Sequence, residues 1–386
     1  MNTMKTKEDA TGVWLDLPTI RQRIDAGDEL MLHWLAERTF LVRMVGRIKH
    51  AEGKTLQASD REAEVFSKMR RECERLGLNG DYVSELWSTM MFFSKVTECQ
   101  EVGIDSFLEH APIPAETLRQ NLLELTEATA ANYDEYCTGD GTNAMRAYRA
   151  GEHLKIEKAI SHDLPGRECA IDLGCATGQV TELLERHFLT VRAFDCSPHM
   201  CTEAQRRRTW KDGVSFEGHD LSTGIPATDA SVDFVVANFG SASEMGPNLL
   251  PEIRRVLKPG GRALLSHYNS DALLNYWFYP WPSTVRARLN RHNGTIEVWT
   301  SNRVYTVEAQ GMTVAGLETD FQDNGLDVVE LVTYPTIQAI LPKFFFSSQH
   351  ADADEMTRIA QRIDEHLAES GLHRGTYIVT EVQKTK

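Results

Sequence analysis

The sequence predicts a multidomain protein in which an all-helical segment precedes an α/β domain with a doubly wound sheet. Apolar residues recur at helical spacing from about residue 17 to residue 100. From about residue 131, short apolar runs alternate with helix-like segments, and the glycine-bearing turn IDLGCATG follows the first run. We place a helical domain at residues 12–100, a helical connector at 101–130 and the α/β domain at 131–386, with a lid insertion at about 270–310.

The helical domain divides into three helices. Apolar periodicity predicts one long helix over residues 17–51, a second over 59–76 and a third over 82–100, separated by Gly53 and the turn GLNGD. Asp16 and Ser59 are expected to cap the first two helices, and Glu62 follows Ser59 at capping-box spacing. A helix as long as the first cannot bury its apolar stripe alone. We therefore expect an intertwined homodimer.

The α/β domain reads as alternating strands and helices. The expected order is strand CAIDLG, helix TGQVTELLERH, strand TVRAFDCS, helix HMCTEAQRRRT, strands VSFEGHDL and VDFVVANFG, helix LLPEIRRVL, and the strand that KPGGRALLSHYN feeds. This order suits a doubly wound parallel sheet. TIEVWTSNRVYTVEAQG then predicts a hairpin, and GLDVVELVTY and RGTYIVTEVQ predict the last two strands.

Composition excludes several classes of partner. The net charge of −15 argues against nucleic acid, because phosphate binding depends on a basic surface. No apolar run approaches the roughly 20 residues that span a bilayer, and the N-terminal stretch lacks the apolar core of a signal peptide, so we expect a cytoplasmic protein without a membrane partner. The seven scattered cysteines form no metal-ligand pattern, so we predict no metal site. A small-molecule substrate is favoured.

The helical domain carries cations at positions where a plain helical bundle would use Leu or Ala. With LPTIRQRIDAGDELMLHWLAERTFLVRMVGRIK, SDREAEVFSKMR and SKVTE, residues 12–100 resemble the AroQ class of chorismate mutases. The resemblance implies that two arginines bind the substrate carboxylates and a lysine meets the ether oxygen. It implies a pocket of Arg21, Arg38, Lys49, Arg61, Glu62, Ser94 and Glu98.

Glu98 leaves the activity of this domain open. Many members of the family carry Gln at this position, and an ionised Glu98 would repel the ether oxygen on which negative charge grows. Only a protonated Glu98 could donate a hydrogen bond there. Three interpretations remain at this point: a working mutase, an isochorismate-pyruvate lyase with the same cations, or a module that serves only for dimerisation.

The α/β domain resembles the class I S-adenosylmethionine-dependent methyltransferases over residues 131–386. The matching features are DLGCATG, an aspartate ending the second strand, GHDL, VDFVVANFG and LKPGGRALLS, with Ala176 in place of the family's middle glycine. A dinucleotide site is the rival reading of a glycine-rich turn, and the downstream features favour the methyltransferase. The resemblance implies a Rossmann-like fold and S-adenosyl-L-methionine as cofactor. The implied cofactor-binding residues are Tyr133, Asp172, Gly174, Cys175, Gly178, Asp195, Ser197, Met200, Asp220, Leu221, Asn238 and Phe239.

Methyl transfer requires an aligned acceptor, and a base only when the acceptor must lose a proton. The candidate catalytic residues are His267, Tyr268 and Asn238, and the candidate lid residues are Tyr276, Trp277, Trp281 and Arg286. Arg286, Arg288 and Arg291 also fit a solvated helix face. We expect a small carboxylate substrate, such as an α-keto acid methylated beside its carbonyl, because the chain is also similar to 2-ketoarginine-type C-methyltransferases. The alternatives are a bifunctional enzyme that also converts chorismate and a non-catalytic scaffold.

Overall fold

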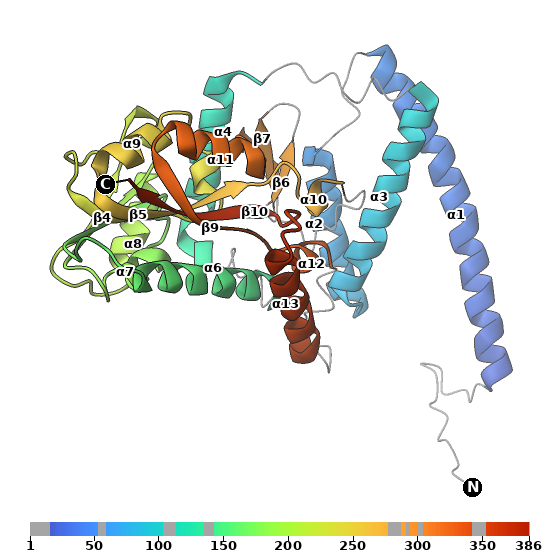
Figure 1. The fold of residues 1–386 in the computed structure, drawn as a ribbon. Coiled ribbons are helices and arrows are strands. Elements are labelled where there is room, and N and C mark those ends of the chain that lie inside the picture. The colour runs from blue at the N-terminus through green and yellow to red at the C-terminus, as the bar shows by residue number, and fades with distance from the viewer. Residues whose placement is uncertain are drawn as a thin grey trace, which may run out of the picture. The chain divides into compact units, whose positions relative to one another are not determined.

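The computed structural model describes residues 16–52, 59–102, 113–134, 143–276, 287–290, 294–299, 304–341 and 353–385 (Figure 1). The chain divides into two compact units. One unit comprises residues 1–58 and 89–111, and the other comprises residues 59–88 and 112–386.

The first unit is built from two helices. Helix α1, Leu17–Ala51, has the predicted bounds, and Asp16 caps it by accepting a hydrogen bond from the Thr19 backbone N–H at 2.9 Å. The second half of α3, Gly80–Val102, belongs to the same unit. The two helices approach closely at Gly46, where an added Cβ would lie 3.3 Å from the Cα of Glu98. A larger residue at this position would push the helices apart.

Helix α1 exposes large apolar side chains along much of its length. In a single copy of the chain, Leu30 is 71% exposed, Leu32 is 66% exposed and Phe40 is 60% exposed. So many exposed apolar side chains on one helix are unusual in soluble proteins and typically mark an interface. The others on α1 include Leu17, Ile24, Met31, Leu41 and Ile48.

The second unit begins with α2, Ser59–Leu76, which has the predicted bounds, and with the start of α3, which extends two residues beyond each predicted end. The connector contains α4, Ala115–Thr129, and the short helix η2, Ala130–Asn132. Asn121 of α4 donates to the Thr306 carbonyl on β8, Val304–Glu308, at 2.8 Å. The connector is therefore packed onto the second unit. Helix α6, Asn143–Ser161, follows it.

A seven-stranded sheet has the order β3-β2-β1-β4-β5-β10-β9. Strands β1 to β5 are parallel, which confirms the Rossmann-like prediction. Their bounds are β1 Cys169–Leu173, β2 Thr190–Asp195, β3 Val214–Gly218, β4 Val232–Ala237 and β5 Leu257–Tyr268, followed by β9 Leu326–Tyr334 and β10 Tyr377–Lys384.

Strand β10, for which the sequence predicted no direction, runs antiparallel to both β5 and β9. The first residue of β10, Tyr377, pairs with Tyr334, the last residue of β9. The chain between them forms α12, Ile337–Ile340, and α13, Ala353–Glu369, and returns at the same end of the strands at which it left. A strand parallel to β9 would need a connection that crosses to the opposite end of the strands.

Apolar side chains fill both faces of the sheet. Strand β4 is buried along its whole length, and its alternate residues Phe234 and Val235 belong to two different core clusters. This burial on both faces is typical of a parallel sheet covered by helices. The nearby helices are α7 Gln179–Leu184, α8 Pro198–Arg207, α9 Leu249–Val256 and α11 Val314–Asp323, with the short helices η3 Leu221–Thr223, η4 Ser241–Ser243 and α10 Leu273–Tyr276.

The lid region contains a small antiparallel sheet of β6 Ala287–Asn290, β7 Thr295–Trp299 and β8. The β7–β8 pair confirms the predicted hairpin. The helix-face interpretation of the arginine run is wrong for Arg288, which lies on β6 opposite Glu297 of β7. Backbone pairing with β7 overrides the helical spacing there. Among the described helices, none is long and apolar enough to cross a membrane.

Candidate functional site

The loop between β1 and α7 is shaped for close approach of its backbone to a ligand. Gly174, Ala176 and Gly178 all have positive φ, at 73°, 45° and 83°, and Gly178 caps α7. An added Cβ at Gly174 would lie 3.0 Å from the Cβ of Ser241, so this position requires glycine. Ala176 adopts the left-handed region at some energetic cost, which such loops tolerate at binding sites. Cys175, between these residues, is buried.

Asp195 lies at the carboxyl end of β2, beside this loop. Its carboxylate accepts backbone N–H groups of Ala176 and Ser197, each at 2.9 Å, and it is only 7% exposed. Burial raises the pKa of Asp195. Ser197 caps α8 by accepting the backbone N–H of Met200, and the Met200 side chain is buried. Asp195 therefore ties the β1–α7 loop to the start of α8.

Asp172 lies in β1 beneath the same loop. Its Oδ2 accepts the Thr181 hydroxyl at 2.6 Å, and the residue is 1% exposed. Burial, with the nearby charge of Asp195 adding to it, raises the pKa of Asp172 to about 7. Burial thus disfavours the charged form of both acids near this loop.

Two further predicted cofactor-binding residues, Asp220 and Leu221, follow β3. Asp220 caps η3 by accepting the Ser222 backbone N–H at 3.1 Å and pairs with Arg119 of α4 at 2.8 Å. The Ser222 hydroxyl also donates to Asp220, at 2.6 Å, and this bond is the main cause of the lowered pKa of Asp220. Leu221 is buried beside it. Asp220 is thus already engaged by the connector.

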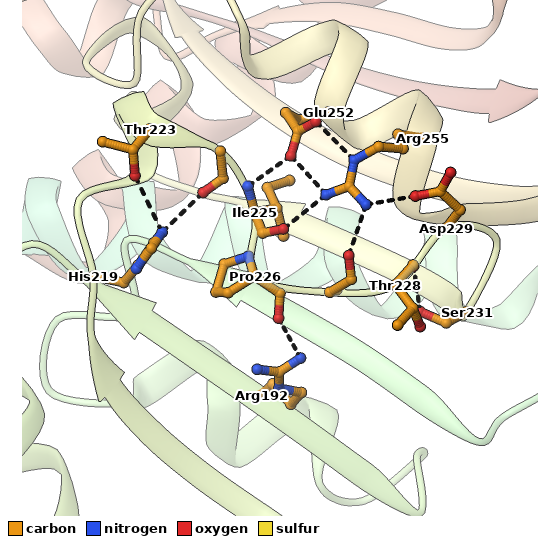
Figure 2. Close-up of polar contacts among 12 residues, drawn as sticks. Arg192, His219, Thr223, Ile225, Pro226, Thr228, Asp229, Ser231, Glu252 and Arg255 are labelled. Carbon is orange, nitrogen blue, oxygen red and sulfur yellow. Dashed lines mark hydrogen bonds and ion pairs between the residues drawn. The ribbon is translucent and has the colours of Figure 1, made fainter.

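The loop after Asp220 is held by Arg255 of α9 (Figure 2). Arg255 donates to the carbonyls of Ile225 and Ala227 at 2.8 and 2.7 Å and pairs with Glu252 at 2.7 Å. Glu252 in turn accepts the Ile225 backbone N–H at 2.8 Å. The sequence analysis missed this network. The pair RR in LLPEIRRVL signals only a charged helix face, because the acceptors of Arg255, two carbonyl groups and the carboxylates of Glu252 and Asp229, come together only in the fold.

The carboxyl end of β4 leads into a group of aromatic rings. Asn238 and Phe239 end the strand region, and Gly240 follows with φ 81°. An added Cβ at Gly240 would lie 2.7 Å from both Tyr268 and Tyr377. The ring of Tyr377 lies 5.2 Å from that of Tyr268 and 5.9 Å from that of Phe239. We call Phe239, Tyr268 and Tyr377 the aromatic wall.

Glu244 stands at one end of the aromatic wall, and the sequence analysis missed it. The Tyr268 hydroxyl donates to its Oε1 at 3.1 Å. Burial raises the pKa of Glu244 to about 7, and the charge of Asp195 adds to the shift. The only signal in the sequence is an acid in FGSASEMG, shortly after a strand end where ligands bind in such folds.

His267 faces the other side of the sheet. Neighbouring residues of a strand point to opposite faces, so Tyr268 points toward Glu244 and His267 toward α11. Its ring lies 6.2 Å from that of Phe321, and it is 4% exposed. Burial lowers the pKa of His267 to about 4. A catalytic role for His267 stays a prediction, but its surroundings favour a packing role.

Arg149 of α6 stands at the other end of the aromatic wall and was also missed. Its guanidinium carbon lies 4.8 Å from the Phe239 ring centre and 5.8 Å from that of Tyr133, and the residue is 9% exposed. It donates to the Gln179 side chain at the start of α7. A buried cation beside aromatic rings is suited to an anionic ligand.

The segment that carries Tyr133 is tied to the glycine-bearing loop. Asp134 accepts the Thr177 hydroxyl at 2.6 Å and the Gln179 amide at 2.5 Å, and it pairs with Arg207 at 3.2 Å. A cavity of about 340 Å³ opens here, lined by Tyr133, Asp134, Thr177, Glu203, Arg206 and Arg207, with residues 130–132. The segment of Tyr133, a predicted cofactor-binding residue, therefore borders the loop.

The helical unit brings together four of the residues predicted for the mutase-like pocket. Arg38 donates to the Ser94 hydroxyl, and Lys49 pairs with Glu98 at 2.8 Å. Glu98 is 6% exposed, and burial lowers the pKa of Arg38.

The other residues predicted for the mutase-like pocket and the lid are exposed or lie outside the description. Arg21 is exposed on α1, while Arg61 lies on α2 in the other unit, where it is exposed and pairs with Glu64. Tyr276 ends α10. The side chains of Glu62 and Tyr276 lie outside the description, as do the residues Trp277, Trp281 and Arg286.

Two family models match the chain. Residues 20–98 match chorismate mutase type II, and residues 170–261 match a methyltransferase domain, which confirms both resemblances read from the sequence. The chain is 28% identical over 155 residues to a demethylmenaquinone methyltransferase of Clavibacter sepedonicus, covering 40% of this chain and 63% of that protein. It is 32% identical over 83 residues to a T-protein of Enterobacter agglomerans, covering 22% of each.

Among solved structures, an S-adenosylmethionine dependent methyltransferase from Mesorhizobium loti is similar with a TM-score of 0.40 and 17% identity, covering 64% of this chain and 99% of that one. The chain spans less than two thirds of the length of either relative named above.

Proposed function

The chain joins a chorismate mutase type II segment to a methyltransferase domain, and from this premise we propose that it is an S-adenosylmethionine-dependent methyltransferase for a small carboxylate substrate. The reaction that best suits the site is methylation of an α-keto acid at the carbon beside its carbonyl. A carbonyl acidifies that carbon, so removal of one proton gives an enolate that attacks the methyl group. The helical unit serves mainly for dimerisation.

The cradle formed by the β1–α7 loop and Asp195 carries the proposal. The loop presents backbone with positive φ at the carboxyl end of the sheet, and Asp195 lies where a ribose would offer two hydroxyl groups. Buried acids near the loop suit a cofactor that carries a sulfonium and an ammonium group, because a cation favours their ionised forms.

Arg149 supports an anionic substrate. Its guanidinium lies against Phe239, which is one of the predicted cofactor-binding residues after the end of β4. A substrate carboxylate at Arg149 would hold the neighbouring carbon near the aromatic wall. This fits alignment of an electron-rich acceptor, which is the main requirement of the reaction.

The exposed apolar side chains of α1 support a homodimer. A second copy would cover side chains such as Leu32 and Phe40, and each buried side chain of this size contributes about 1.5–3 kcal/mol. We expect Phe40→Glu to convert a dimer into a monomer in light scattering, whereas Asp25→Asn on the same helix should leave the dimer intact. A dimer that survives Phe40→Glu together with Leu32→Glu would place the interface elsewhere.

Titration calorimetry with S-adenosylmethionine tests the cofactor assignment. The unaltered protein should bind, and Asp195→Ala should lose about 1–3 kcal/mol, the value of charge-assisted hydrogen bonds. Asp212→Ala, at an exposed acid before β3, is the matched control and should bind as the unaltered protein does. Unchanged affinity in Asp195→Ala would contradict the site, and labelled cofactor with a panel of keto acids would identify the acceptor.

A second activity in the helical unit is favoured by one arrangement. Arg38 with Ser94, and Lys49 with Glu98, retain the polar partners expected of a chorismate mutase pocket. A bifunctional enzyme would convert chorismate there and methylate a derived acid. Chorismate consumption by the unaltered protein tests this, with Arg38→Ala as the inactive control.

A further inference from the structure

Glu244 borders the cofactor cradle through the segment that follows β4. Ser241 and Met245 flank it, and an added Cβ at Gly174 would lie 3.0 Å from the Ser241 Cβ and 3.3 Å from the Met245 methyl carbon. The segment therefore packs directly on the β1–α7 loop. Glu244 is close enough to Asp195 and Cys196 for its charge to interact with both.

Tyr268 fixes the carboxylate of Glu244. The Tyr268 hydroxyl donates to Oε1 at 3.1 Å, which leaves Oε2 available to a ligand. Gly240 allows this arrangement, because any Cβ there would meet the Tyr268 ring at 2.7 Å. Glu244 is partly exposed, as a group that reaches a bound molecule must be. Glu244 thus stands beside the cradle, at the end of the aromatic wall that Tyr268 forms.

We propose that Glu244 is the general base of the methyl transfer and that Tyr268 positions it. This inference rests on the proposed function. The Glu244 carboxylate removes a proton from the carbon beside the carbonyl, and the electron pair of that C–H bond forms the enolate. The enolate carbon bonds to the methyl carbon as the bond from methyl to sulfur breaks. The sulfur keeps that electron pair and becomes the neutral thioether of S-adenosylhomocysteine, while Glu244 later releases its proton to water.

The surroundings of Glu244 suit this role. Burial and Asp195 raise its pKa to about 7, and a base with a pKa near the working pH is the most effective. The groups that face it are Asp195 and Cys196 at the end of β2 and Tyr268 on β5, and Tyr268 in turn faces Tyr377 of β10 and Tyr133. The Tyr268 hydrogen bond opposes the rise by stabilising the carboxylate.

Proton exchange tests the base separately from methyl transfer. The protein, saturated with S-adenosylhomocysteine, is incubated in D2O with 2-ketoarginine or phenylpyruvate, and NMR follows loss of the proton beside the carbonyl. The unaltered protein should catalyse exchange at a rate that rises with pH through about 7. Glu244→Gln should reduce this rate by about 10²- to 10⁴-fold and abolish the rise, because an amide cannot accept the proton.

Tyr268→Phe separates positioning from catalysis. Loss of its hydrogen bond should move the rise in rate to higher pH, a change that a purely structural role would not produce. Glu318→Gln, at an exposed acid of α11, is the matched control and should keep both the rate and the profile. If His267→Gln abolished the rise in rate with pH and Glu244→Gln did not, the proposal would be overturned.

Two further outcomes would also overturn it. One is an unaltered protein that exchanges neither acid. The other is a Glu244→Gln protein whose loss of rate is matched by its loss of cofactor affinity in calorimetry, since Glu244 would then act as a counter-ion. In the first case, retained binding of S-adenosylmethionine would leave the methyltransferase assignment standing. Failure of the unaltered protein to bind the cofactor would instead contradict the proposed function.

Discussion

The two units hold their buried charges in opposite ways. In the helical unit, Lys49 and Glu98 neutralise each other at 2.8 Å. In the α/β unit, Asp172 and Glu244 accept hydrogen bonds from uncharged hydroxyl groups, and burial raises the pKa of each to about 7. The difference shows what each site requires of a ligand. We expect an anion in the first to displace an internal ion pair, and a cation in the second to stabilise the charged forms of acids that no internal cation neutralises.

The largest effect on the α/β unit is expected from a side chain added at Gly240, against the aromatic wall. Gly240→Ala places a Cβ 2.7 Å from two tyrosine rings in a backbone region that costs about 1–2 kcal/mol for a side chain. Overpacking should add about 1–3 kcal/mol. We expect a lower melting temperature and loss of methyl transfer. Gly246→Ala has the same backbone conformation with open space around it, and should lose only the backbone part.

The Lys49–Glu98 ion pair predicts a second large effect, on chorismate turnover in the helical unit. Glu98→Gln removes the partner of Lys49 and supplies an amide that donates a hydrogen bond without titrating. Chorismate turnover at neutral pH should rise at least several-fold over the unaltered protein, as measured by chorismate absorbance. If the domain is only a dimerisation module, neither protein will consume chorismate, and both will form the same oligomer in light scattering.

The α/β acids predict a pH dependence of cofactor binding. Their raised pKa values mean that the folded protein without cofactor binds more protons than the unfolded chain, so its stability falls as pH rises from about 4 toward 7. A bound cation reverses this preference. Affinity for S-adenosylmethionine should therefore increase between pH 6 and 8, by up to about tenfold per unit for each coupled group. S-adenosylhomocysteine, whose sulfur is neutral, should show a smaller increase; equal slopes for the two would contradict the role of the sulfonium.

The smallest effect is expected at the contact between the Tyr133 segment and the loop. Asp134→Asn keeps the shape of the side chain but removes its charge, so its bonds to Thr177 and Arg207 weaken by about 1 kcal/mol each. Cofactor affinity should fall by about tenfold or less in calorimetry. Glu203→Gln lines the same cavity and is a matched control that should change affinity little.

The sequence predicted most of the fold because local patterns decide it. The bounds of α1 and the alternation of β1 to β5 follow from apolar periodicity, and the cap of α1 follows from Asp16. The antiparallel β10 was not predictable in the same way, since its direction depends on where α13 returns the chain. Strand β6 was missed because only pairing with β7 organises its four residues.

Sequence motifs predicted part of the candidate site, whereas residues that only the packing of the fold brings to it were missed. Asp195 follows from its place at a strand end. Glu244 and Arg149 become candidate site residues only because Tyr268, Phe239 and the turn at Gly240 bring them to the same group of rings. His267 was singled out beside Tyr268, yet one step along a strand turns a side chain to the opposite face.

The central place of β10 has a consequence for the order in which the protein folds. The ribosome makes β10 after every other strand of the large sheet, although β10 separates β5 from β9. Until it emerges, β9 lacks its partner in the sheet and the aromatic wall lacks Tyr377. Strand pairing over long sequence separations is also slow. We therefore expect the nascent chain to complete its cofactor cradle before its substrate wall, so that a partly synthesised protein could hold the methyl donor before it can align an acceptor.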